Sequence, residues 1–210
     1  MIAWALLAAF AAGTDWMAVR TGRSRVEGVA KPAVMVALIG LAATADLEPA
    51  SVRPWIVAAL VFGLVGDLAL LPQVDRFIVG LGSFLVGHLA YVVAFGLTWD
   101  PGPLLAAGAA GLVLLLAWFG RPIERSIRGS SLRVPVLAYV AVTCVVIVAG
   151  SGTGRWVIAA GALAFALSDG LLGSDRFVSP RPDRRVWIHV LYHVGQAAIV
   201  TGVLAGAPGS

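Results

Sequence analysis

Long apolar runs alternate with short polar stretches along the whole of this chain. A bilayer core about 30 Å thick is crossed by about 20 helical residues, or by slightly fewer where the helix does not tilt. Eight runs approach that length, and they cover about 2–19, 31–45, 54–72, 77–97, 103–119, 133–150, 155–173 and 186–206. They are too long for barrel strands and lack a period of two, which favours helices. The pattern predicts an all-α polytopic membrane protein in which residues 1–210 form a single transmembrane domain.

The composition agrees with this fold class. Hydrophobic residues make up 60% of the chain and charged residues only 12%, which lies outside the range of soluble domains. The first run has no basic segment before it and continues past Asp15 to Val19, so we expect a membrane span there rather than a cleaved signal peptide. Cys144 is the single cysteine, so no disulfide can form within the chain.

The basic residues are distributed unevenly over the connections between runs. The odd-numbered connections and the adjoining run ends carry 13 of the 15 Lys and Arg, and the even ones carry only Arg53 and Arg155. The positive-inside rule then places the odd connections in the cytoplasm and both termini outside. The net charge of +4 is explained by this topology, and we expect no nucleic-acid partner. The high ratio of Arg to Lys and the abundance of Ala and Gly are typical of GC-rich bacterial genomes, so we expect a bacterial cytoplasmic (inner) membrane protein.

Two aspartates inside apolar runs have matching surroundings. The first context contains Asp67, Asp75-Arg76-Phe77, His88 and Tyr91, and the second contains Asp169, Asp175-Arg176-Phe177, His189 and Tyr192. Asp67 and Asp169 are 102 residues apart, and the histidines and the tyrosines are each 101 apart. An offset of 102 also places Lys31, which precedes Pro32, over Arg133, which is followed after one residue by Pro135. Each is expected at the start of a span, where proline is tolerated. We therefore predict a parallel 4+4 repeat with halves of about 1–100 and 101–210.

The polar residues inside the runs indicate a site. A carboxylate near the middle of a membrane helix costs about 2.5–3.5 kcal/mol, so we expect Asp67 and Asp169 to serve a function. At about 1.5 Å per residue, Asp15, Lys31 and the first turns of the last run lie near the same, cytoplasmic boundary. His88 and Tyr91 are expected deeper, near the middle of the fourth run. This distribution favours a polar cavity open to the inner leaflet over a conduction path.

Several of these polar residues could instead have a purely structural role. Asp15 could pair with Arg20 at the interface, Lys31 could extend toward the headgroups, and His88 could join helices with Tyr91 close to it. Asp75 and Asp175, each next to an arginine, are expected to cap loops or to be paired.

His189 and His193 lie one helical turn apart, a spacing that can clamp a metal ion. Together with Asp67, Asp169 or His88 they could hold zinc. No Glu accompanies the pair, however, and His189 is also the repeat partner of His88. We expect no metal and no cofactor, with a zinc site as the alternative.

Several short motifs occur in a fixed order along the runs. They are Lys31-Pro32, Gly66-Asp67, Gly80-Leu-Gly-Ser-Phe84, Gly87-His88-Leu-Ala-Tyr91, Ser168-Asp169, and Tyr192 with Gln196. With these motifs the chain resembles, over nearly its whole length, the YhhN or lysoplasmalogenase family of eight-span membrane proteins. The resemblance implies hydrolysis of the vinyl ether bond of lysoplasmalogens to a fatty aldehyde and a glycerophospho-base. Ala69 stands where that family is expected to have leucine, and the pair His189 and His193 is not part of its pattern.

Vinyl ether cleavage needs a proton on an alkene carbon, and water then attacks the resulting oxocarbenium ion. A protonated and an ionised carboxyl group could share this work, as in glycosidases. Our hypothesis makes Asp67 and Asp169 that pair, without assigning which is the acid. In the same hypothesis His88 and Tyr91 orient water or a carboxylate, and Lys31 binds the phosphate.

The remaining residues of the motifs complete this hypothetical site. They are expected to line it, together with an aspartate of the first run: Ser168, Tyr192, Gln196 and Asp15. The partner is then a single-chain lipid from the inner leaflet. Two alternatives are a proton-coupled small-molecule transporter, which needs matched polar residues in the outer half, and a zinc-dependent lipid amide or ester hydrolase, which needs His189 and His193. The sequence does not specify an oligomeric state.

Overall fold

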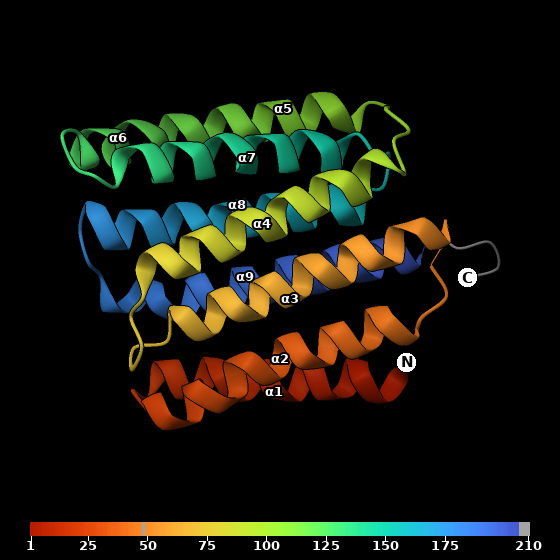
Figure 1. Ribbon diagram of the computed structural model, residues 1–210, viewed down its shortest axis with the longest axis horizontal. Helices are drawn as coiled ribbons and strands as arrows, with labels where there is room; N and C mark the ends of the chain where they lie inside the picture. Colours follow the sequence, from red (N-terminus) through yellow and green to blue (C-terminus); the bar gives the residue numbers. More distant parts are fainter. Residues whose placement is uncertain (48, 206–210) are drawn as a thin grey trace.

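A computed structural model of the chain describes residues 1–47 and 49–205, which are helical almost throughout (Figure 1). The α-helices are α1 (Ile2–Arg20), α2 (Ser24–Thr44), α3 (Arg53–Ala69), α4 (Phe77–Gly96), α5 (Leu104–Leu115), α6 (Arg121–Ile127), α7 (Arg133–Ser151), α8 (Trp156–Phe177) and α9 (Pro182–Leu204). A 3-10 turn, η1 (Ala50–Val52), leads into α3, and a π-helical segment, η2 (Leu116–Gly120), joins α5 to α6 without a break.

Eight helical segments of the described chain are long and apolar enough to cross a membrane, as predicted. Four α-helical spans extend four or more residues past a predicted end. Helix α2 begins at Ser24, α6 carries the fifth span to Ile127, α8 ends at Phe177, and α9 begins at Pro182. The prediction that Lys31-Pro32 opens a span was wrong, since these residues lie about two turns inside α2. Pro135 does lie in the first turn of α7, as expected.

Six helices form a closed series of packed neighbours in the order α2, α3, α4, α7, α8, α9 and back to α2. Helix α1 packs outside this ring against α2 and α9, and α5 packs outside it against α7 and α8 (Figure 1). Small residues face each other in the pairs α3–α4 and α8–α9 and let these helices approach closely. A Cβ on Gly161 would lie 2.8 Å from the Gly195 carbonyl oxygen, and one on Gly87 would lie 3.0 Å from that of Ala59.

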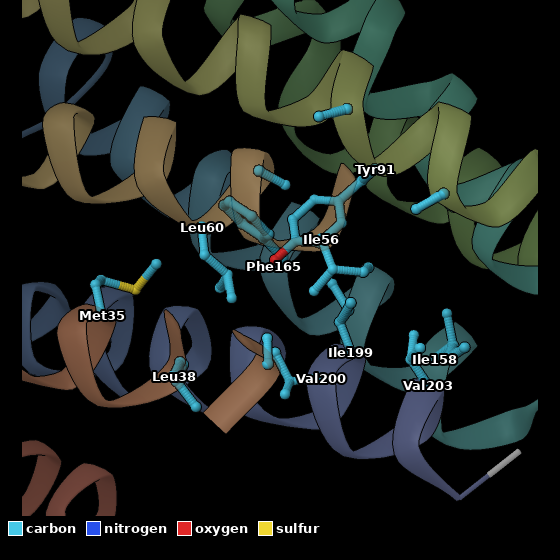
Figure 2. Packing of buried hydrophobic residues seen from close by; sticks show 14 of the residues in the cluster. Met35, Leu38, Ile56, Leu60, Tyr91, Ile158, Phe165, Ile199, Val200 and Val203 are labelled. Atoms are coloured by element: carbon cyan, nitrogen blue, oxygen red, sulfur yellow. The ribbon is translucent and has the colours of Figure 1, made fainter. Parts of the chain in front are cut away.

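The interior of the ring is divided by depth. The half nearer to the even-numbered connections is filled by apolar side chains such as Ile56, Ile158 and Ile199 (Figure 2). The buried charged residues and histidines of the described chain lie toward the odd-numbered connections or near the middle of the spans. They are Asp15, Glu27, Lys31, Asp67, His88, His189 and His193. This one-sided distribution agrees with the prediction from sequence; the internal repeat and the orientation of the termini stay predictions.

Candidate active site

A cavity of about 320 Å³ lies between α4, α5, α6, α7 and α8. Most of its wall is apolar and is formed by side chains such as Leu81, Leu112, Phe119, Val140 and Ile147. Two carboxylate residues, Asp169 and Glu124, belong to the wall. The π-helical segment η2 contributes to the same wall, and such segments are frequent at functional sites.

Asp169 has two neighbours, Tyr139 on α7, which also belongs to this wall, and His88 on α4. The Tyr139 hydroxyl donates a hydrogen bond of 2.8 Å to Asp169 Oδ2. His88 Nε2 lies 3.6 Å from the same oxygen. The side chain of Asp169 is 16% exposed, compared with 1% for that of Asp67, because Asp169 faces the cavity.

The hydrogen bond of His88 to the backbone indicates which of its ring nitrogens carries a hydrogen. His88 Nδ1 lies 2.8 Å from the Phe84 carbonyl oxygen, which can only accept, so Nδ1 must carry a hydrogen. In the neutral ring Nε2 is then an acceptor, and it faces a carboxylate oxygen of Asp169 that is also an acceptor. The pair Asp169–His88 therefore brings a carboxylate and an imidazole, two groups that can exchange protons, together beside an apolar cavity.

Asp67 has different partners from Asp169. Lys31 Nζ lies 3.1 Å from Asp67 Oδ1, and Lys31 also lies over the ring of Tyr192, 5.9 Å from its centroid. The Tyr192 hydroxyl is next to Asp67 and donates to Met35 Sδ at 3.3 Å. An adjacent buried hydrogen bond between Tyr91 and Gln196 ties α4 to α9.

Aromatic rings lie between the two aspartates. Phe165 packs against the rings of His88 and Tyr192, with centroids 4.8 and 5.2 Å away. Phe84 packs edge-on against Tyr192 at 5.8 Å and belongs to the cavity wall. Among the residues that the structure describes, no hydrogen bond or ion pair joins Asp67 to Asp169. The two aspartates of the sequence hypothesis thus lie in separate contacts on the two sides of an aromatic layer.

A third polar group joins α1, α2 and α9. His189 Nδ1 lies 2.7 Å from Asp15 Oδ2, and Glu27 accepts from Arg185 at 2.8 Å. Trp16 Nε1 donates to His193 Nδ1 at 3.2 Å. Asp15 is fully buried, so the interpretation of it as an interfacial partner of Arg20 was wrong.

This group also bears on the zinc alternative. The rings of His189 and His193 are engaged by α1 and lie almost perpendicular, with centroids 6.2 Å apart. Within residues 1–47 and 49–205, no three His, Cys, Asp or Glu side chains are arranged to hold a metal ion. The ligand set that this alternative requires is not assembled.

The other predicted residues have structural partners. Ser168 donates to the Ile188 carbonyl oxygen at 2.8 Å and fixes α8 to α9. Asp75 pairs with Arg176 at 3.0 Å, and Asp175 accepts from the Arg181 amide at 2.6 Å, which confirms their expected pairing and capping roles.

Sequence reasoning missed Tyr139, Glu124 and the aromatic residues of the wall. A usable signal existed for Tyr139, because all three tyrosines of the chain are buried in spans. Phe77, Phe84 and Phe177 stood in the quoted motifs, but nothing marked them as site residues, since aromatic residues are ordinary in apolar runs.

Comparisons with known proteins support the family resemblance of the sequence motifs. A sequence model described as the YhhN family matches residues 26–203. The "Lysoplasmalogenase" of Mycobacterium bovis is 30% identical over 200 residues, covering 89% of this chain and 73% of that protein. The human "Lysoplasmalogenase TMEM86B" is 32% identical over 150 residues, covering 70% of this chain and 62% of that protein. The mouse protein of the same name is 31% identical over 163 residues, covering 75% and 67%. No solved structure gives a significant match.

Proposed function

This chain belongs to the YhhN family, and we propose that it hydrolyses the vinyl ether bond of a lysoplasmalogen, releasing a fatty aldehyde and a glycerophospho-base. The names of its relatives support the substrate class. The observation that carries the proposal is the pair Asp169–His88, whose carboxylate belongs to the wall of an apolar cavity and whose imidazole lies 3.6 Å from that carboxylate. An alkenyl lipid needs both features, namely apolar walls for its chain and an acid beside its double bond.

The substrate enters from the inner leaflet with its single chain in the cavity. Apolar side chains of α5 and α7 face this chain, and removing it from water stabilises binding by roughly 0.8 kcal/mol per methylene. The vinyl ether group then lies beside Asp169. A lipid with two chains would need a second apolar channel, so a single-chain substrate is the better match for this cavity.

The reaction begins with transfer of a proton from Asp169–His88 to the alkene carbon that is not bonded to oxygen. A C–H bond forms, the double bond is lost, and the positive charge is shared between the other carbon and the ether oxygen. Water adds to that carbon and returns a proton to the pair. The resulting hemiacetal separates into aldehyde and alcohol. Tyr139 holds the carboxylate in place throughout, through its hydrogen bond of 2.8 Å.

We assign to Asp67 the role of the ionised carboxylate in the hypothesis of two aspartates. The Lys31 ammonium at 3.1 Å favours its charged form. Its negative charge and the rings of Phe84 and Tyr192 favour a cation forming on the cavity side of the aromatic layer. Tyr91 and Gln196 support this arrangement by fixing α4 against α9. Lys31 is occupied by Asp67, which leaves the substrate phosphate to other groups.

The test is aldehyde release by the purified protein in detergent, with the saturated ether analogue as the substrate control. Asp169→Asn should lower kcat roughly 100-fold or more, because it cannot deliver the proton. The matched control is Asp183→Asn, at an exposed aspartate in the first turn of α9, which should be indistinguishable from wild type. Normal turnover by folded Asp169→Asn, or no release by the wild-type protein, would overturn the proposal.

A further inference from the structure

The cavity has a charged end in addition to its apolar body. Glu124, at 26% side-chain exposure, belongs to the cavity wall and accepts hydrogen bonds from two arginines. Arg128 donates through Nη2 at 2.9 Å and Nε at 3.4 Å, one bond to each carboxylate oxygen. Arg133 donates to Oε1 at 3.2 Å from the first turn of α7. The Glu124 contact also raises the pKa of the Arg128 guanidinium above its ordinary value.

The stability of the fold does not explain this triad. The arginine side chains are 66% and 48% exposed, and such surface pairs contribute only about 0–1 kcal/mol each. Topology alone requires basic residues at this end of the bundle but does not require that a cavity-lining carboxylate hold them. The two arginines against one glutamate leave one positive charge. That excess matches the single negative charge of a phosphate diester, which guanidinium groups bind well.

The position along the bundle fits the same ligand. Gly170 of α8 packs against Phe119, and Gly173 packs against Ile123, so α6 runs parallel to α8 at this contact. Glu124 therefore lies about 7 Å farther along the axis than Asp169, toward the odd-numbered connections. In a lysoplasmalogen five bonds separate the vinyl ether oxygen from the phosphorus, and this length suits the separation.

We propose that Arg128 and Arg133 bind the phosphate of the lysophospholipid, and that Glu124 is a positioning residue that holds both guanidinium groups at the mouth of the cavity. This inference rests on the proposed function and extends it by assigning the headgroup site. The two arginines replace Lys31 as the predicted phosphate-binding group, because the Lys31 ammonium is engaged by Asp67. The enzyme then selects phosphate-bearing single-chain ethers over neutral alkenylglycerols.

The test measures binding without catalysis. Its probes are a saturated alkyl lysophosphocholine, which cannot be hydrolysed, and the matching alkylglycerol without phosphate, each titrated calorimetrically into the full-length protein in detergent. The variant Arg128→Ala/Arg133→Ala should weaken binding of the phospholipid about tenfold or more and leave the alkylglycerol unchanged. Arg125→Ala, at an exposed arginine of the same short helix, is the matched control and should change neither. Inorganic phosphate at millimolar concentration should not displace the lipid; if it does, the site is one for free phosphate and the inference fails.

A second variant and a second readout separate the two proposals. Glu124→Gln keeps both arginines but releases them, and it should raise KM for a lysoplasmalogen several-fold with kcat unchanged. If aldehyde release is normal and the arginine variants alter neither affinity nor KM, the headgroup site is refuted while the proposed function stands. If no aldehyde forms but the binding preference for phosphate depends on these arginines, the site stands and the vinyl ether reaction is refuted.

Discussion

Replacement of Lys31 by methionine should destabilise this protein strongly, because it leaves a buried carboxylate without its partner. Asp67 is 1% exposed, and the Lys31 ammonium lies 3.1 Å from it. Removing one partner of such a buried pair costs about 3–5 kcal/mol. The opposite single change should cost less. In Asp67→Leu, Lys31 retains the nearby negative charge of Asp15, and its side chain is 11% exposed.

The double variant Lys31→Met/Asp67→Leu completes the cycle. Replacing a buried ion pair by apolar residues of similar volume is often neutral or stabilising, so the double variant should lie within about 1 kcal/mol of wild type or above it. The expected order of stability is therefore double variant, Asp67→Leu, and then Lys31→Met. Aldehyde release should nevertheless be impaired in the double variant, since the ionised carboxylate is gone.

The assay is reversible unfolding in mixed micelles of detergent and sodium dodecyl sulfate, followed by circular dichroism. Arg23→Met, in the exposed first connection, serves as a control for loss of a positive charge and should change the free energy of unfolding by less than about 0.5 kcal/mol. A Lys31→Met protein within 1 kcal/mol of wild type would refute the reasoning, because Asp67 would then not depend on the ammonium for its burial.

Three further predictions follow from packing, from the site and from topology. Gly66→Ala places a Cβ 2.6 Å from the Phe84 ring and should lower the free energy of unfolding by about 1–3 kcal/mol. In the control Gly82→Ala the new Cβ meets nothing within 4 Å, so this variant should be neutral or stabilising. Equal effects of the two variants would contradict the packing. Tyr139→Phe removes the hydroxyl that binds the cavity carboxylate and should lower kcat about 10- to 100-fold with KM nearly unchanged, and an unaltered kcat would exclude that role. In intact cells without the native cysteine, Asp100→Cys should react with a membrane-impermeant maleimide and Arg23→Cys should not, and the reverse pattern would invert the orientation.

The number and order of the spans could be predicted because a bilayer requires apolar runs of a fixed length. The start of α2 could not, because Arg25 and Glu27 interrupt the apolar run and looked like a connection. Glu27 is tolerated inside the bundle because Arg185 of α9 binds it at 2.8 Å, 158 residues farther along the chain. Such a distant partner leaves no trace in the local pattern.

For the site, it was easier to predict which polar residues are buried than which side chains contact each other. A polar residue inside an apolar run is a local signal, and it correctly marked Asp67 and His88 as buried. Which side chains meet depends on how each helix is rotated about its axis, which side-chain spacing within one helix does not determine. The pairing of Lys31 with Asp67 and of His88 with Asp169 therefore appears only in three dimensions.

The differing partners of the two aspartates explain how similar sequence contexts can give two chemical roles. In the predicted repeat, His189 corresponds to His88 and should therefore face Asp67. It instead binds Asp15 of α1 at 2.7 Å, and Asp67 is left to Lys31. Helix α1 thus binds His189, the histidine of the second half of the predicted repeat. Helices α5 and α6 instead line the cavity beside Asp169. In the proposed mechanism, the outer helices therefore determine which aspartate donates the proton and which stays ionised, and the fold provides one proton-donating site rather than two.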